Sequence, residues 1–504
     1  MIVLSPDLES YLPRIRSTAV YNVARRTATE FAPVLSQRLG NRVWLKREDQ
    51  QPVFSFKLRG AYNFLAKADP ALLAKGVVAA SAGNHAQGVA LGARILGVKA
   101  TIVVPVTTPS VKVEAIRRLG AEVILHGETY DEAFARAKEF DLVFVHPYDD
   151  DDVIAGQGTV GLELIEDMPV TPDVVFVPVG GGGLLAGVAL AVKALSPSTK
   201  VYGVEPVDAA AMYHSLESGQ RVRLDTVGLF ADGVAVRQVG EATFRICQEL
   251  VDGVILVEND DICAAVKEVF EDRRAVLEPS GALAYAGLKE WVKTTKASEL
   301  NLVAIASGAN LNFDRLRHIS ERAQIGDRRE AIFAVHIPER PGAFVQLCKA
   351  IGNRPVTEFN YRFGNPDQAT VFVGIEIIDQ KDREQIMFNM QTSGFDSIDL
   401  TEDELAKTHI RHMVGGRASQ DLDERFVHVD FPERPGALLK FLTGLGSGWN
   451  ISLFHYRNHG TDRGRVLAGI QIPVEDRDLF NQRLTDLGYT YTEVTDQPSL
   501  KFFL

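Results

Sequence analysis

The chain has 504 residues, 46% hydrophobic and 24% charged, which suits a globular protein of two to four domains. Its net charge of -12 argues against nucleic acid or an anionic membrane as partner. Three widely spaced cysteines argue against a disulfide framework or a zinc site and favour a reduced cytosol, so we expect a cytoplasmic protein. Neither a membrane-spanning apolar run nor a signal peptide is expected.

The first motif is a lysine between two apolar residues, Lys57 in the segment Ser55–Gly60. Phe56 and Leu58 give the amine apolar surroundings, which lower a lysine pKa toward that of a reactive neutral amine. Phe56 could also pack against a cofactor ring. A lone lysine is more often a solvated surface group, so this motif depends on those that follow it.

Apolar strands alternate with alanine-rich helices through the first two thirds of the chain. We predict strands over 76–80, 100–104, 121–125, 173–177, 201–204 and 302–306, and helices over 86–96, 110–119 and 184–195. The alternation predicts an α/β fold with a mostly parallel sheet that is buried on both faces. Ligands bind such sheets at the carboxyl ends of the strands, and three further motifs directly follow strands.

The first of these motifs is the loop at 81–88, which opens a helix. Free backbone N–H groups at a helix start suit a carboxylate, here that of an amino-acid substrate. Asn84 offers an amide donor for a phenolic oxygen, although it could instead be a helix cap. We expect His85 to pack locally rather than to perform catalysis. The residues assigned to substrate binding are Ser81, Ala82, Gly83 and His85.

The second motif is a glycine run, made of Gly180, Gly181, Gly182 and Gly183 and followed by Leu184. Glycines allow close backbone approach, and the following helix dipole favours an anion such as a monophosphate. The same residues also satisfy a dinucleotide fingerprint, with Glu205 as its acidic residue. That alternative, an NAD-dependent dehydrogenase, leaves the lysine segment and the 81–88 loop without a role.

The third motif is Ser307, which follows the predicted strand over 302–306. A serine hydroxyl is a weak partner for a pyridine nitrogen, which it need not keep protonated. The alternative is a simple Ser-Gly turn.

Together these motifs resemble the serine/threonine dehydratase family of pyridoxal phosphate (PLP) enzymes, over about the first 320 residues. The resemblance implies a two-lobed, fold-type-II (tryptophan synthase β-like) catalytic domain at 1–325. Lys57 would form the Schiff base with PLP and remove the substrate proton. The other implied cofactor contacts are Phe56, Asn84, Gly180 to Gly183, Leu184 and Ser307.

The activity that the resemblance implies is deamination of L-threonine to 2-oxobutanoate and ammonia, which begins isoleucine synthesis, with L-serine as a poorer substrate. Ala82 stands where related racemases carry a second serine, so racemisation should be poor. In those racemases the residue that corresponds to Glu205 and an aspartate six positions later help to hold a divalent cation. That later position is Ala211 here, so one ligand is missing and we expect no tight divalent metal site.

The rest of the chain contains an internal repeat. The segment Ile337–Phe344 recurs as Phe431–Leu438, and Phe359–Arg362 recurs as Phe454–Arg457. Each copy predicts a strand, a Pro-Glu-Arg-Pro-Gly turn, a helix and two strands. Two copies are too few for a solenoid, so we expect two small α+β modules, at 330–402 and 424–504.

The turn before the helix resembles the amino-acid-binding ACT-type regulatory module, and the pair resembles the regulatory half of feedback-controlled members of the same family. The resemblance implies inhibition by isoleucine, opposed by valine, and we expect a homotetramer. Another PLP elimination or replacement reaction, or a non-catalytic amino-acid sensor, stays open. The residues expected to line effector sites are Phe359, Tyr361, Arg362, Phe454, Tyr456 and Arg457.

Overall fold

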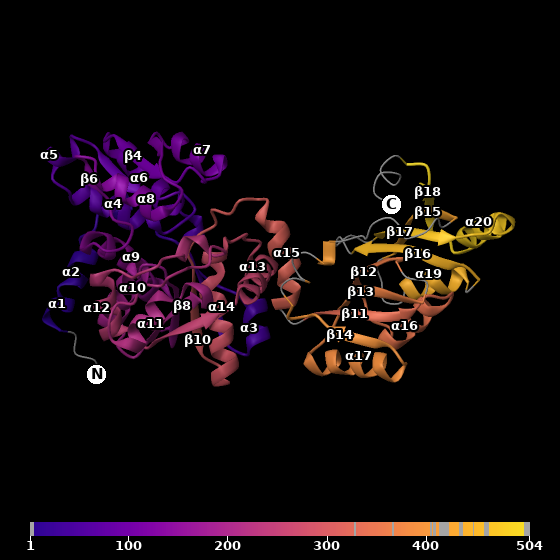
Figure 1. The fold of residues 1–504 in the computed structure, drawn as a ribbon. Coiled ribbons are helices and arrows are strands. Elements are labelled where there is room, and N and C mark those ends of the chain that lie inside the picture. Colours follow the sequence, from indigo (N-terminus) through magenta and orange to yellow (C-terminus); the bar gives the residue numbers. More distant parts are fainter. Residues whose placement is uncertain are drawn as a thin grey trace. The chain divides into compact units, whose positions relative to one another are not determined.

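The structure, a computed structural model, describes residues 5–326, 329–364, 367–403, 406, 410–412, 423–432, 437–446, 448–457 and 463–497. The chain forms two compact units, Met1–Ala323 and Gln324–Leu504 (Figure 1). None of the described helices is both long and apolar enough to cross a membrane.

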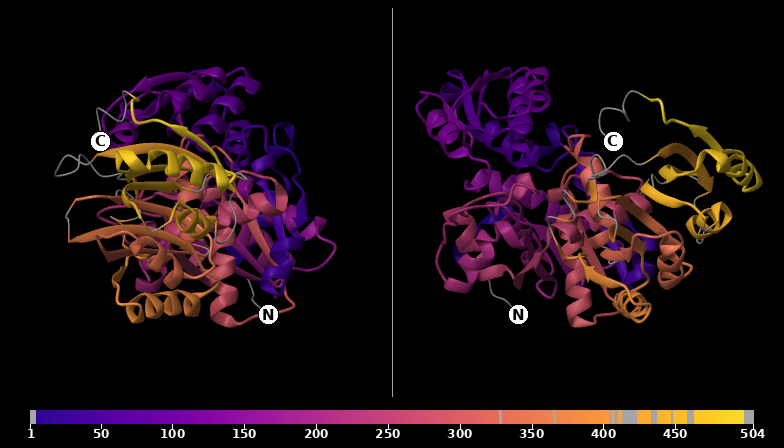
Figure 2. Two further views of the ribbon diagram at one scale, coloured as in Figure 1. Left: turned by 90° about the vertical axis from the view of Figure 1, so that its right-hand side faces the viewer. Right: turned by 45° about the vertical axis from the view of Figure 1, so that its right-hand side comes forward.

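The described part of the first unit contains two sheets, which lie in separate lobes (Figures 1 and 2). The six-stranded sheet has the order β1 (Thr29–Phe31), β2 (Arg42–Arg47), β10 (Asn301–Ala306), β7 (Val174–Pro178), β8 (Lys200–Pro206) and β9 (Gly253–Val257). The four-stranded sheet has the order β5 (Glu122–Leu125), β4 (Ala100–Val104), β3 (Val77–Ala80) and β6 (Val143–Phe144). All neighbouring strands are parallel except β1 and β2.

Helices cover both faces of each sheet. The four-stranded lobe carries α4 (Lys57–Lys67), α5 (Pro70–Leu73), α6 (Asn84–Leu96), α7 (Ser110–Arg118) and α8 (Tyr130–Lys138). The six-stranded lobe carries α1 (Pro6–Glu9), α2 (Tyr11–Arg16), α3 (Pro33–Leu39), α9 (Asp151–Asp167), α10 (Gly183–Leu195), α11 (Ala211–Ser218), α12 (Glu241–Leu250), α13 (Asn259–Arg273), α14 (Pro279–Thr295) and α15 (Arg315–Gly326).

Alternate residues of the central strands bury against different helices. On β7, Val175 and Val177 pack in a core with α9, α10 and α12, whereas Val174 and Phe176 pack in a core with α13 and α14. The predicted α/β fold with parallel strands buried on both faces is therefore confirmed. The alternation of strands and helices did not show, however, that the strands divide between two sheets.

A buried group of four charged side chains fixes the first turn of α4. Lys46, Glu48, Arg59 and Glu163 are all fully buried. Arg59 donates to Glu48 at 2.8 Å and to Glu163 at 2.6 Å, and Lys46 donates to Glu163 at 2.6 Å. Two cations and two carboxylates balance, as burial of ions requires. This network joins α4 to α9 and β2, and so holds the segment that carries Lys57.

The described part of the second unit forms one antiparallel sheet of eight strands. Its order is β14 (Asp396–Asp399), β11 (Glu330–Pro338), β13 (Gln368–Glu376), β12 (Val356–Arg362), β16 (Asn450–Arg457), β17 (Arg463–Gln471), β15 (Glu424–Pro432) and β18 (Thr490–Glu493). The helices are α16 (Ala343–Ile351), α17 (Gln380–Thr392), α19 (Ala437–Leu445) and α20 (Arg477–Asp486), and all four contribute to one apolar core against the sheet.

Each copy of the repeat follows the order strand, helix, strand, strand, helix, strand, which confirms the expected pair of α+β modules. The modules meet where β12 pairs with β16, and there Phe359 lies opposite Tyr456, Asn360 opposite His455 and Tyr361 opposite Phe454. Because equivalent residues differ by 95 in number, this register relates the copies by a two-fold axis at Asn360 and His455.

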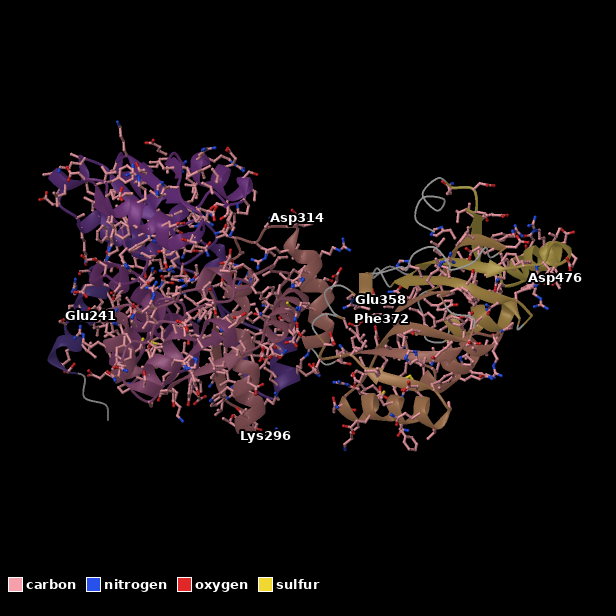
Figure 3. The ribbon with its side chains drawn as sticks, in the orientation of Figure 1. Glu241, Lys296, Asp314, Glu358, Phe372 and Asp476 are labelled. Atoms are coloured by element: carbon pink, nitrogen blue, oxygen red, sulfur yellow. The ribbon has the colours of Figure 1, made fainter. Side chains whose placement is uncertain are left out.

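The sheet face turned away from these helices carries buried polar groups. Glu358 on β12 and Phe372 on β13, both labelled in Figure 3, lie on this face, because their strand neighbours Phe359, Val371 and Val373 belong to the core against the helices. Arg411 covers Glu358, donating to its carboxylate at 3.0 Å, and the backbone carbonyl of Arg411 accepts from Asn360 at 3.0 Å.

Candidate active site

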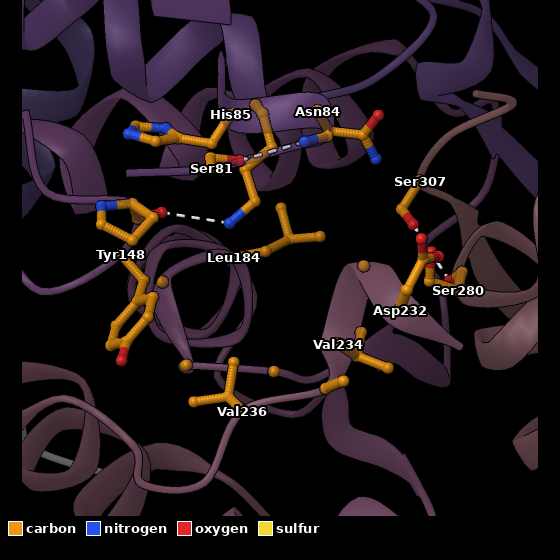
Figure 4. Close-up of a pocket in the computed structure, with 18 of the residues that line it drawn as sticks. Ser81, Asn84, His85, Tyr148, Leu184, Asp232, Val234, Val236, Ser280 and Ser307 are labelled. Atoms are coloured by element: carbon orange, nitrogen blue, oxygen red, sulfur yellow. Dashed lines mark hydrogen bonds between the residues drawn. The ribbon is translucent and has the colours of Figure 1, made fainter. Parts of the chain in front are cut away.

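One cavity of about 270 Å³ lies at the carboxyl ends of β3, β7 and β10 in the first unit. Strands from both lobes therefore contribute to it. Figure 4 shows Ser81, Asn84 and His85 at one side and Ser280 and Ser307 at another. All the residues predicted to bind the cofactor or substrate line this cavity: Phe56, Lys57, Ser81, Ala82, Gly83, Asn84, His85, Gly180, Gly181, Gly182, Gly183, Leu184 and Ser307.

Lys57 is the first residue of α4, and its backbone N–H donates to the Ser55 hydroxyl at 3.2 Å. Its Nζ lies 3.0 Å from the Pro147 carbonyl and 5.4 Å from the centroid of the Phe56 ring. Burial disfavours the ammonium form and lowers the pKa of Lys57 to about 8. A substantial neutral fraction near neutral pH makes this amine nucleophilic and basic.

The loop after β3 presents polar groups at the start of α6. Ser81 Oγ accepts from the Gly83 N–H at 3.2 Å, and a Cβ built at Gly83 would meet nothing within 4 Å, which leaves room for a ligand. Asn84 is the first residue of α6 and donates to Glu278 at 2.6 Å. His85 is buried and bonded to the Val145 carbonyl at 2.9 Å, and burial lowers its pKa to about 3. His85 is therefore neutral.

The glycine run forms the turn between β7 and α10. Gly182 has φ +96°, in the region that favours glycine, and a Cβ there would lie 2.7 Å from Met212 and 2.8 Å from Thr243. A Cβ at Gly181 would overlap the Tyr148 ring at 2.2 Å. Thr243 also donates to the Gly181 carbonyl at 2.7 Å. Backbone N–H groups at this helix start can therefore approach an anion closely.

Ser307 follows β10 and donates to the Ser280 carbonyl at 3.2 Å. Its own carbonyl accepts from the Phe56 N–H at 3.2 Å, and Ser55 forms a β-bridge with Gly308. The serine loop and the lysine segment are thus joined, although 250 residues separate Ser307 from Lys57.

Sequence reasoning missed the loop between β6 and α9. His146 Nδ1 accepts from Asp149 N at 2.8 Å. Asp149 accepts from the first two N–H groups of α12 at 2.9 Å, and Asp150 caps α9. These bonds fix Pro147 against Lys57 and Tyr148 against the glycine run. No motif marks this loop. Two further cavity residues, Lys112 and Asp232, were also not predicted. Glu278 and Asn310 line the cavity as well, and Glu278 lies in a segment that resembles an active-site segment of the family.

These residues fit PLP. The half-buried amine of lowered pKa would hold the aldehyde of PLP, the glycine turn at a helix start its phosphate, and the uncharged hydroxyl its ring nitrogen. The dinucleotide alternative fits poorly, because the fully buried Glu205 carboxylate accepts from the N–H groups of Met212 and Tyr213 at 2.9 and 2.8 Å. It is committed to the start of α11 rather than to a ribose.

Within the described residues, no group of three or more His, Cys, Asp or Glu side chains is placed to hold a metal ion. Burial raises the pKa of Glu205 to about 8. Ala211, which stands where the related racemases carry an aspartate, is the first residue of α11.

The residues expected at effector sites lie at the module junction. Phe359, Tyr361, Phe454 and Tyr456 are buried in the core of the second unit. Arg362 lies on the opposite face and donates to Glu424 at 2.8 Å.

The Arg457 backbone pairs in β16, but its side chain lies outside the described residues, as does the second turn over 433–436. A small cavity opens elsewhere, between the first turn, Arg340–Gly342, and Trp449–Ile451 of the second module.

Family models match both units. Residues 20–308 match the model of pyridoxal-phosphate dependent enzymes. Residues 321–410 and 415–504 each match the C-terminal regulatory domain of threonine dehydratase.

Similar proteins extend over the whole chain. The biosynthetic L-threonine dehydratase of Burkholderia multivorans is 54% identical, covering 98% of this chain and 99% of that protein. That of Pasteurella multocida is 52% identical, covering 99% and 98%. Among solved structures, the processed threonine deaminase isoform 2 of Solanum lycopersicum aligns with TM-score 0.63 and 50% identity, covering 64% of this chain and 90% of that one.

Proposed function

The chain belongs to the biosynthetic threonine dehydratase family of PLP-dependent lyases, and from this premise we propose that it deaminates L-threonine to 2-oxobutanoate and ammonia at the entry to isoleucine synthesis. The observation that carries the proposal is the convergence of Lys57, Asn84, the glycine run and Ser307 on one cavity. These residues come from both lobes and from positions far apart in the sequence.

Lys57 would hold PLP through its amine, the turn at Gly180 to Gly183 would hold the phosphate, and Ser307 would face the ring nitrogen. When bound, PLP supplies an electron sink for a carbanion at the substrate Cα. Lys57 Nζ is the base that takes the Cα proton, because its pKa of about 8 keeps part of it neutral near neutral pH.

The loop Ser81–Gly83 binds the substrate carboxylate. Its backbone N–H groups lie at the start of α6, where the helix dipole also favours an anion. Gly83 leaves the space that the carboxylate needs. Ala82 offers no proton donor to the opposite face, which favours elimination over racemisation.

L-threonine is preferred over L-serine in this proposal. The apolar part of the cavity, which includes Leu184 and Val234, would bury the threonine methyl group. One methyl group in an apolar pocket is worth about 1–3 kcal/mol, so kcat/KM for L-serine should be about 10 to 200 times lower.

A visible spectrum of the purified protein and an oxo-acid assay with threonine test the proposal. We expect the absorption of lysine-bound PLP and steady formation of 2-oxobutanoate. Lys57→Ala should abolish turnover, because the amine that attaches PLP and the base that takes the Cα proton are both lost. Small amines added to the assay should restore part of the activity. Lack of the PLP absorption would favour a dehydrogenase or a sensor. PLP without oxo-acid formation would favour another PLP reaction.

Regulation by isoleucine, opposed by valine, is the second part of the proposal. The cavity between the two modules has turn N–H groups at Gly342, before α16, that suit a carboxylate, and an apolar wall with Ile451 and Leu442 that suits a branched side chain.

The expected effector residues lie behind the same cavity. The Phe344 ring, which lines it, lies 5.5 Å from the ring of Phe359, 5.0 Å from that of Tyr361 and 6.5 Å from that of Phe454. An occupied cavity would therefore press on the rings at the module junction. The proposal also includes a homotetramer and a cytosolic location. The three cysteines are buried and unpaired, which suits a reducing compartment such as the cytosol.

A further inference from the structure

The orientation of the Asn84 amide is determined by its partners. Asn310 Nδ2 lies 2.7 Å from the Val53 backbone carbonyl, which can only accept, so this atom must be the nitrogen. The same Nδ2 lies 2.6 Å from Asn84 Oδ1. An amide nitrogen carries two hydrogens, and Asn310 uses one on each acceptor. Asn84 must therefore turn its oxygen toward Asn310.

The nitrogen of Asn84 then lies on the other side, 2.6 Å from Glu278 Oε1. Glu278 is buried, and a Cβ built at Gly308 would lie 2.3 Å from the same oxygen, so the carboxyl group is closely confined. One N–H of Asn84 serves Glu278, and the second remains for the cavity that Asn84 lines. With the opposite orientation, Asn84 would offer the cavity an oxygen.

We propose that Asn310 and Glu278 are positioning residues that make Asn84 present an N–H, rather than a carbonyl, to the phenolic oxygen of PLP. The inference rests on the proposed function, because it assumes that PLP is the ligand. A hydrogen-bond donor at this phenolic oxygen stabilises the anionic form of the oxygen. It therefore influences both the absorption of the cofactor and its capacity to accept electrons. The role proposed for Asn310 and Glu278 is exerted through their hydrogen bonds to Asn84.

The informative variant is Asn310→Asp, which keeps the shape and removes both hydrogens. The introduced carboxylate would repel the Val53 and Asn84 oxygens, and the Asn84 amide would turn its nitrogen toward it. We expect the visible band of bound PLP to shift and the PLP dissociation constant to rise about tenfold or more, as for loss of a charge-assisted hydrogen bond. The kcat for threonine should fall more than its KM rises.

Three further variants separate positioning from folding. Glu278→Gln keeps an acceptor for Asn84, so it should shift the band less than Glu278→Ala does. Asn312→Asp makes the same change two residues further on. The Asn312 side chain accepts from the Asp314 N–H and donates no hydrogen bond to the described residues, so this variant should leave the band and the PLP affinity unchanged. Circular dichroism checks that each variant is folded.

A wild-type spectrum, PLP affinity and kcat in folded Asn310→Asp would overturn the inference and leave the proposed function intact. An equal shift in Glu278→Gln and Glu278→Ala would overturn the role of Glu278 as acceptor. If the unaltered protein itself binds no PLP, both the inference and the proposed function fail.

Discussion

At the scale of the residue, Lys57 links burial to reactivity. Since burial lowers its pKa to about 8, the neutral amine should dominate above that pH. When apoprotein is mixed with PLP, we expect the rate of cofactor attachment to rise about tenfold per pH unit below 8 and to level off above it. Stopped-flow absorbance measures this rate. A rate still rising through pH 10, as for a solvated lysine of pKa about 10.4, would contradict the assigned environment.

The candidate site was predictable only where residues carry local signals. Lys57 has apolar neighbours, and Asn84, the glycine run and Ser307 each follow a strand, so the sequence predicted their meeting. Asn310 and Asn84 lie 226 residues apart, and only tertiary structure sets their hydrogen bond. Tyr148 was missed because its role is to pack against Gly181, which depends on shape and leaves no sequence motif.

At the scale of the element, the turn between β7 and α10 requires glycine for two reasons, the positive φ of Gly182 and the lack of space for a Cβ at that position. Substitutions can separate the two effects. Gly182→Ala would strain the backbone, at a cost of about 1–2 kcal/mol, and push against Thr243, whose hydroxyl bonds to Gly181. We expect fluorescence titration to show PLP binding weakened about tenfold or more.

Gly219 provides the matched control, because it has φ +70° and a Cβ there would meet nothing within 4 Å. Gly219→Ala should cost only the backbone strain and leave PLP affinity unchanged. Equal affinity in both variants would mean that the turn does not hold the phosphate.

The junction of α4 with α9 and β2 depends on the buried ion network. Arg59→Met leaves Glu48 and Glu163 without their main partner, so the free energy of unfolding should fall by about 3–5 kcal/mol. Arg26→Met, which removes exposed ion pairs with Glu166 and Asp167, should lower it by less than about 1 kcal/mol. Urea denaturation followed by circular dichroism compares the two. Similar losses would mean that the network contributes no more than surface pairs.

Elements with strong patterns were predicted well. The expected strands over 100–104 and 302–306 match β4 and β10 closely, because continuous apolar runs mark strands buried on both faces. The short β6 was not predicted, although it lies within the apolar run Leu142–Val145. The partners of each strand were not predictable, because β3 and β7 have similar apolar sequences but belong to different sheets.

At the scale of the whole molecule, the two units should separate catalysis from control. A truncated chain ending at Arg328 keeps every residue assigned to the cavity and should retain PLP and threonine turnover while losing inhibition by isoleucine. In the full chain, isoleucine and threonine should weaken each other's binding by the same factor, since coupling is reciprocal. Calorimetric titrations measure both. Isoleucine inhibition that persists in the truncated chain would contradict the regulatory assignment.

The seam between β12 and β16 shows how the duplicated half could have arisen. A single module cut at this seam would expose β12 along its edge, with unpaired N–H and C=O groups and with the rings of Phe359 and Tyr361 beside it. The two-fold relation at Asn360 and His455 means that a second, identical copy would meet that edge in the same geometry. The present sheet is thus what a symmetric dimer becomes when one chain encodes both halves. Such a fusion would fix their stoichiometry and free each copy to diverge, and Asn360 here faces His455 where two identical copies would place two identical residues.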